Sequence, residues 1–85
     1  MKIEKKIQQW SFDAILDGSK NFELRLADWE CQPGDILVLL EIDEKREYTG
    51  RVLEKEVGYV LRTKEVEFFT PEEIEKHGFQ IISLR

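Results

Sequence analysis

The chain has little cysteine and histidine, and it has no long apolar run. Its single cysteine, Cys31, cannot close an internal disulfide, and one histidine leaves no Cys/His cluster for a metal ion. No apolar stretch approaches the roughly 20 residues that span a bilayer. The first six residues lead into no apolar segment of the secretory type. We therefore expect a reduced, cytoplasmic protein without a metal, a cofactor or a membrane partner.

An excess of positive charge is also missing. The 13 Lys and Arg residues are outnumbered by 18 Asp and Glu residues, so the formal net charge is −5. Proteins that grip long nucleic acids through phosphates are normally basic. The charge balance disfavours such extended binding, but it leaves open the recognition of a single nucleotide at a local cluster of cations.

Repeats, low-complexity tracts and linkers are absent from the sequence as well. A chain of 85 residues is too short for several cores, and its 41% apolar and 36% charged residues are typical of a folded domain. We predict one domain that covers residues 1–85.

A short helix is predicted at residues 9–17. Phe12, Ile15 and Leu16 recur at the spacing of one helix face. Gly18 follows and can adopt the left-handed conformation that ends a helix.

A second helix is predicted at residues 71–77. Thr70 is a suitable N-cap, Pro71 is favoured at the first helical position, and Glu73 completes a capping box. Gly78 ends this helix after two turns.

Alternating residues predict several strands. The clearest case places Phe22, Leu24 and Leu26 on one face, with Glu23 and Arg25 on the other. The order of strands and helices favours an α+β, β-rich fold, a small, partly closed and mostly antiparallel β-barrel with two short helices. The predicted strands cover about 2–7, 21–26, 35–41, 51–61 and 79–84. The predicted core contains Phe12, Ile15, Leu16, Phe22, Leu24, Leu26, Val38, Leu40, Val57, Tyr59 and Ile81.

Three charged residues next to the first helix are the main candidates for chemistry. Lys20, Glu23 and Arg25 place a carboxylate between two cations at the mouth of a predicted strand. Such a carboxylate accepts an exocyclic amine, while the arginine offers a planar fork to a carbonyl or a phosphate. An exposed, salt-bridged strand face would show the same spacing.

These residues belong to a longer pattern. The segment from Gly18 to Arg25 matches G-x-K-x-x-E-x-R, the signature of ASCH domains, and Pro33-Gly34-Asp35 is similar to the turn that opens the family's next strand. Nearly the whole chain resembles the ASCH branch of the PUA-like fold, in particular a compact family of unassigned function. The resemblance implies a barrel with a cleft that binds RNA or a single nucleotide or modified base through Lys20, Glu23 and Arg25.

One branch of the ASCH family hydrolyses acetylcytidine with a lysine and a threonine of the signature strand and a distant glutamate. Lys20 matches the lysine, whereas Glu23 stands in place of the threonine. We therefore place an RNA- or nucleotide-binding module first. A small amidohydrolase acting on an acylated nucleoside is the alternative, and an interaction module with a merely solvated charged face is the third hypothesis.

Five further residues complete the candidates. Trp29 lies in a polar loop after the signature strand and is predicted to stack on a base. Arg51 flanks a turn and is assigned to the cleft, although a role in a hairpin fits equally. Trp10 is predicted to be core, Cys31 a buried inert thiol, and His77 a cation at a helix end.

Overall fold

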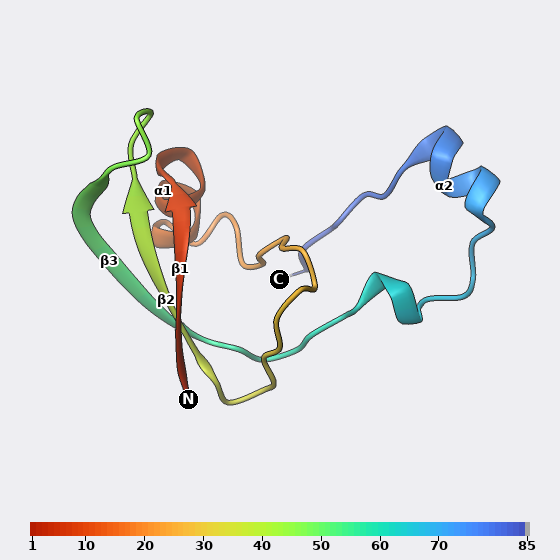
Figure 1. Cartoon of the computed structure of the whole chain (residues 1–85), viewed down its shortest axis with the longest axis horizontal. Coiled ribbons are helices and arrows are strands. Elements are labelled where there is room, and N and C mark those ends of the chain that lie inside the picture. Colours follow the sequence, from red (N-terminus) through yellow and green to blue (C-terminus); the bar gives the residue numbers. More distant parts are fainter. Residues whose placement is uncertain (85) are drawn as a thin grey trace.

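The computed structural model describes residues 1–84, which form a small open sheet, two α-helices and a 3-10 turn (Figure 1). Strands β1 and β2 are parallel, β2 and β3 are antiparallel, and the sheet order is β1-β2-β3. The predicted α+β class is confirmed. The elements are β1 (Lys2–Gln8), α1 (Gln9–Leu16), β2 (Ile36–Ile42), β3 (Tyr48–Glu56), η1 (Thr63–Glu65) and α2 (Pro71–His77).

The core lies between α1 and one face of the sheet, which we call the inner face. Leu39 in the central strand is 1% exposed and packs with Ile7 of β1 and with Phe12 and Ile15 of α1. Leu53 of β3 lies opposite Leu39 in the register and packs against the same cluster. The helix thus covers the sheet with two residues of its predicted apolar face, Phe12 and Ile15, while Leu16 is exposed.

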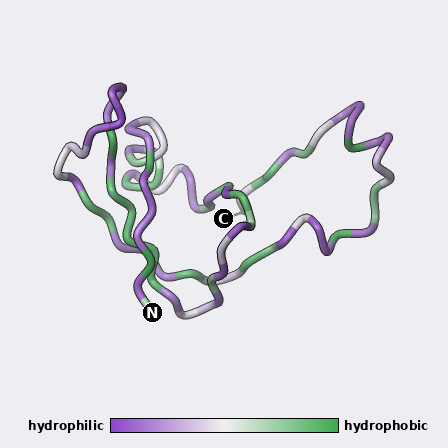
Figure 2. Tube along the Cα trace, viewed as in Figure 1, coloured by the Kyte–Doolittle hydropathy of each residue, from purple (hydrophilic) through white to green (hydrophobic). Residues whose placement is uncertain are grey.

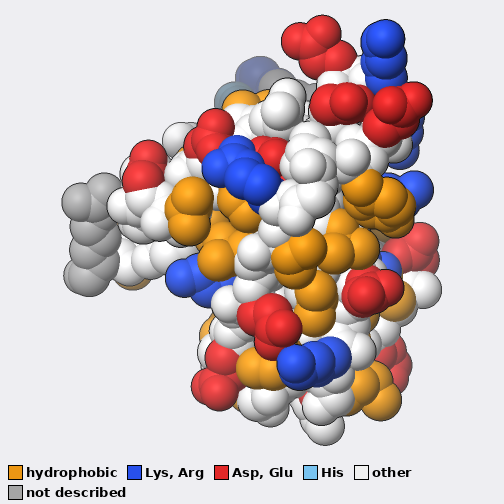
Figure 3. Space-filling view, turned by 90° about the vertical axis from the view of Figure 1, so that its left-hand side faces the viewer, with side chains coloured by type: hydrophobic (Ala, Val, Ile, Leu, Met, Phe, Trp, Pro, Cys, Tyr) orange, Lys and Arg blue, Asp and Glu red, His pale blue; other side chains and the backbone are white. Residues whose placement is uncertain are grey.

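The opposite face of the sheet is covered by side chains of its own edge strands. Val38 is buried there at 9% exposure, although α1 packs against the inner face of the sheet. Lys2 of β1 forms an ion pair with Glu54 of β3 at 3.1 Å, and this pair reaches across β2. On the side of the molecule that carries β3, charged and hydrophobic side chains are accordingly interspersed (Figure 3).

Both predicted helices are confirmed. Helix α1 begins at Gln9 and ends at Leu16, and α2 carries the predicted capping box at its start. The hydroxyl of Thr70 accepts a hydrogen bond from the Glu73 N–H, and the Glu73 carboxylate accepts one from the Thr70 N–H. No helix between residues 1 and 84 is long and apolar enough to cross a membrane.

Two predicted strands are wrong. Residues 21–26 and 79–84 form no strand, and β3 ends at Glu56 rather than continuing to residue 61. The alternation of side chains was sufficient to predict an extended segment, but a strand also needs a partner for its backbone groups. The sheet is also mixed rather than mostly antiparallel, since the connection through α1 returns the chain parallel to β1.

The predicted core is correct only around the sheet and α1. Phe12, Ile15, Val38 and Val57 are buried, and Phe22 and Leu40 are partly buried. The other predicted core residues are exposed, because most of them lie on segments outside the sheet. These are Leu16, Leu24, Leu26, Tyr59 and Ile81.

Residues 58–84 form an arm that extends away from the sheet. Figure 1 shows α2 at the far end of this arm, while the described C-terminal end returns toward α1. Hydrophobic and hydrophilic residues follow one another along the arm (Figure 2). Apolar residues of both the arm and the segment after α1 line the space between them, among them Leu24, Leu61 and Phe79.

Candidate functional site

The signature segment, residues 18–25, begins at a well-defined helix end. Gly18 has a φ of +85°, which suits glycine at this turn. The Ser19 N–H donates to the Asp17 carboxylate at 2.7 Å, and the Lys20 N–H donates to the Ala14 carbonyl at 2.9 Å. These bonds fix the direction in which the segment leaves α1.

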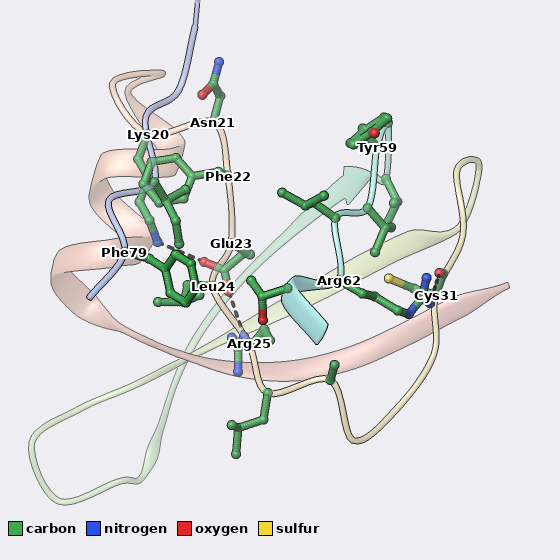
Figure 4. A pocket seen from close by; sticks show the side chains of 18 of the residues that line it. Lys20, Asn21, Phe22, Glu23, Leu24, Arg25, Cys31, Tyr59, Arg62 and Phe79 are labelled. Atoms are coloured by element: carbon green, nitrogen blue, oxygen red, sulfur yellow. Dashed lines mark hydrogen bonds and ion pairs between the residues drawn. The ribbon is translucent and has the colours of Figure 1, made fainter. Parts of the chain in front are cut away.

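The structure brings Lys20, Glu23 and Arg25 together (Figure 4). Lys20 Nζ lies 3.0 Å from Glu23 Oε1, and Arg25 Nε lies 2.8 Å from Glu23 Oε2. The side chains are 14%, 14% and 28% exposed, so the pairs are partly shielded from water. One carboxylate thus lies between two cations, and the cluster carries a formal charge of +1.

Lys20 holds this cluster in place. Its ammonium group also donates to the hydroxyl of Ser11, and it lies 5.3 Å from the ring centroids of both Trp10 and Phe22. Ser11 is 5% exposed. Because hydrogen bonds and rings surround the ammonium, Lys20 acts mainly to position Glu23.

Ser11 is a site residue that the sequence analysis missed, and Trp10 is one that it assigned to the core. Trp10 was predicted to be core but is 66% exposed, and its indole N–H donates to Gln8 Oε1 at 2.6 Å. The spacing of residues along the helix already indicates that Trp10 is exposed, because it lies about 200° around the helix axis from Phe12. The pairing of Ser11 with Lys20 depends on the turn after α1, which local spacing does not determine.

Arg25 and Glu23 keep capacity for a ligand. Arg25 Nη2 donates to the Lys6 carbonyl at 2.6 Å, so this bond and the bond to Glu23 use two of its five N–H groups. Each Glu23 oxygen accepts one bond from a neighbouring cation and can accept another. The pair therefore offers adjacent acceptors and donors, which is the pattern needed to recognise the edge of a planar polar molecule.

The cluster lies on one wall of a large open groove of about 1550 Å³. The signature segment and the inner face of the sheet form one side, where Phe79 of the arm also lies, and Tyr59 and Arg62 at the start of the arm lie on the other (Figure 4). Four cationic side chains line it (Lys20, Arg25, Lys55 and Arg62), against three carboxylates (Glu23, Glu56 and Glu73). The groove is thus locally positive on a chain of net charge −5.

The two other predicted site residues lie in different places. Trp29 lines the groove, and the Lys5 ammonium lies 3.9 Å from its ring centroid. Arg51 lies outside the groove lining and is not brought together with the signature segment. Its guanidinium forms ion pairs with Glu41 at 2.5 Å and with Asp13 at 2.6 Å.

Arg51 belongs to a separate polar network that supports the fold. Glu41 is 2% exposed and accepts hydrogen bonds from Arg51 and from the Thr49 hydroxyl. The hydrogen bonds from Arg51 and then from Thr49 hold the pKa of Glu41 below its usual range, and the Glu41 hydrogen bond raises the pKa of Arg51. The guanidinium also lies 4.5 Å from the Phe12 ring centroid, so this network joins β2, β3 and α1.

Cys31 and His77 show no arrangement of a catalytic or metal site. Cys31 is partly buried in the groove wall, and its carbonyl accepts a hydrogen bond from Arg62 Nη2 at 3.3 Å. His77 lies in the last turn of α2, where a cation is favoured by the helix dipole. Within residues 1–84, no three His, Cys, Asp or Glu side chains are grouped in a way that could hold a metal ion.

Comparison with known protein families identifies the class of this chain. A family model described as a domain of unknown function, DUF3850, matches residues 3–73. The chain therefore belongs to the DUF3850 family. The matched region contains the signature segment, β1 except its first residue, β2, β3 and the start of α2. No match is found among curated proteins or among solved structures.

Proposed function

We propose that the groove binds RNA or a nucleotide, and that Glu23 and Arg25 recognise the edge of a base. The observation that carries this proposal is the Glu23 carboxylate held between Lys20 and Arg25, with unused acceptors and donors, in a locally positive groove. Exocyclic amines of bases donate to carboxylates, and carbonyl and phosphate oxygens accept from guanidinium groups.

The resemblance to ASCH domains supports the same function. The signature residues line a groove beside the first helix, which is where the resemblance implies a cleft. The Asn21 side-chain amide donates to the Leu84 carbonyl at 3.3 Å and so links the signature segment to the end of the arm.

The test is a titration of the ¹⁵N-labelled chain with nucleosides and mononucleotides, followed by NMR. We expect saturable shifts of the Glu23 and Arg25 resonances. Arg25→Ala leaves the partly buried carboxylate with one cation fewer and removes donors, so affinity should fall by about 1–3 kcal/mol. Glu23→Gln exchanges acceptor capacity for a donor and should alter base preference more than fold stability.

Arg46→Ala is the matched control, because this arginine is exposed at the hairpin turn between β2 and β3. It should leave affinity and base preference unchanged. Equal losses in Arg46→Ala and Arg25→Ala would contradict recognition by the signature segment, and the absence of saturable shifts would favour a merely solvated charged face.

A hydrolase is the second candidate, favoured by one contact. The Ser11 hydroxyl on the Lys20 ammonium supplies a hydroxyl that the signature segment itself lacks at Glu23. Ser11 is buried and does not line the groove, which makes attack on a bound substrate difficult. Incubation with acetylcytidine, followed by chromatography, separates the candidates, since turnover that is lost in both Ser11→Ala and Lys20→Ala would establish hydrolysis.

A further inference from the structure

The groove is larger than one nucleotide needs. Sites for small molecules usually measure about 300–1,000 Å³, whereas this groove measures about 1550 Å³. A base at Glu23 and Arg25 would contact only one wall and leave the opposite wall empty. The size of the groove therefore points to a longer ligand.

The opposite wall carries its own binding groups. Tyr59 is 83% exposed although it lines the groove, and Figure 4 shows it together with Arg62 across from Glu23 and Arg25. Arg62 is fixed by its bond to the Cys31 carbonyl, which uses one of its five N–H groups. The exposed ring of Tyr59 and the anchored guanidinium of Arg62 occupy different parts of this wall, so the ring can stack on a base and the guanidinium can bind a phosphate.

The charges select among possible long ligands. The groove lining carries four cations against three carboxylates, so it favours an anionic ligand over a basic or neutral peptide. The chain as a whole carries −5, which disfavours a duplex that would present two rows of phosphates. A single strand with unstacked bases fits both conditions, because rings bind its bases and few phosphates need neutralisation.

We propose that the groove binds a single-stranded nucleic acid segment of about two or three nucleotides. One base meets Glu23 and Arg25, and a neighbouring base stacks on Tyr59 with its phosphate near Arg62. This inference rests on the proposed function of the groove and adds the length of the ligand and a second subsite. Stacking on a ring is tolerant of base identity, so sequence preference should reside at the Glu23 and Arg25 end.

The experiment compares ligand lengths by isothermal titration calorimetry. The probes are AMP and CMP, mixed-sequence RNA trinucleotides and hexanucleotides, the same trinucleotides as DNA, and a hexamer duplex. We expect trinucleotides to bind about tenfold tighter than mononucleotides, with little further gain for hexanucleotides. The duplex should bind more weakly than either single strand of equal length. Equal affinity for RNA and DNA trinucleotides would support recognition of the bases, and a preference for RNA would add a contact to the 2′-hydroxyl.

Variants of Tyr59 and Arg62 test whether the second subsite causes the higher affinity for trinucleotides. Tyr59→Ala should abolish the advantage of the trinucleotide and leave mononucleotide affinity unchanged, whereas Tyr59→Phe should keep both. In a plot of the logarithm of the binding constant against the logarithm of the salt concentration, Arg62→Gln should reduce the magnitude of the slope by about one. Tyr48→Ala is the matched control, because Tyr48 is an exposed tyrosine of β3 that does not line the groove.

The outcomes separate this inference from the proposed function. Equal affinities for mononucleotides and trinucleotides, with a loss in Arg25→Ala, would overturn the second subsite and leave the proposed function intact. A loss in Tyr59→Ala that is equal for both lengths, or the absence of any loss, would also overturn it. If none of the probes binds, both the inference and the proposed function are wrong.

Discussion

Two shielded carboxylates, Glu23 and Glu41, have different roles that follow from their neighbours. Glu23 is held by Lys20 and Arg25 at the wall of a groove, where further polar atoms can approach. Glu41 is almost fully buried, and Arg51 and Thr49 satisfy it within the protein. A buried charge is tolerated only where partners replace water, and both sites meet this condition. Of these two carboxylates, only Glu23 is therefore suited to bind a ligand.

The depressed pKa of Glu41 predicts a pH-dependent contribution to stability. The pKa of Glu41 in the folded chain lies below its ordinary value of 4.5. Ionised Glu41 therefore stabilises the fold at pH values above 4.5. This stabilisation is lost as the pH falls through the pKa of the folded chain. Thr49→Val removes one donor, so the pKa of Glu41 should rise toward its ordinary value. We expect lower urea midpoints for this variant at pH 7, with a gap to the wild type that narrows toward pH 3.

Thr63→Val provides the control, because Thr63 is an exposed threonine in η1. Its midpoint should follow that of the wild type at every pH. A gap between Thr49→Val and the wild type that stays constant from pH 7 to pH 3 would show that the ionisation of Glu41 does not contribute.

At the scale of single residues, local spacing predicted only part of the site. Lys20, Glu23 and Arg25 are close in sequence, so their meeting needed only a turn and an extended segment. Arg51 meets Glu41 through the register of the hairpin and meets Asp13 through the packing of α1. Such partners depend on tertiary contacts, which residue spacing does not contain.

At the scale of elements, the helices were predictable and two strands were not. The capping box of α2 and the apolar face of α1 are local signals, and each helix begins where its signal predicts. The segments 21–26 and 79–84 alternate as strands do, but a ladder needs hydrogen bonds from a partner far away in the sequence. The central strand β2 was found because its apolar run is bounded by turns.

The capping box of α2 leads to an element-level prediction. Thr70→Ala removes the acceptor of the Glu73 N–H and should destabilise the helix by about 1 kcal/mol. Since the arm carries α2 away from the sheet, hydrogen exchange should accelerate for the amides of α2 and stay unchanged for those of β2. The control Thr70→Ser keeps the side-chain oxygen and should preserve the protection of the α2 amides from exchange. If Thr70→Ala accelerated exchange equally in β2, the two elements would unfold together.

At the scale of the whole molecule, apolar burial is concentrated in one region. The buried cluster joins α1 with the inner face of the sheet, while Leu26 remains 81% exposed in the groove. Leu39→Ala should therefore lower the free energy of unfolding by about 2–5 kcal/mol. Leu26→Ala should change it by about 0.5 kcal/mol or less. Urea denaturation measures both, and a large loss in Leu26→Ala would mean that the groove wall is packed in solution.

The parallel pairing of β1 with β2 has a consequence for how the chain folds. Each residue of β1 lies 34 positions before its partner in β2, whereas β2 and β3 are joined by a short turn at residues 43–47. Closing the longer loop costs more chain entropy, so the hairpin should form first and β1 should dock onto it later. In stopped-flow kinetics, Leu53→Ala should then slow folding, whereas Ile7→Val should chiefly speed unfolding. The strand that the ribosome releases first would be the last to join the sheet, and until it docks, one edge of β2 would be open to pairing with another chain.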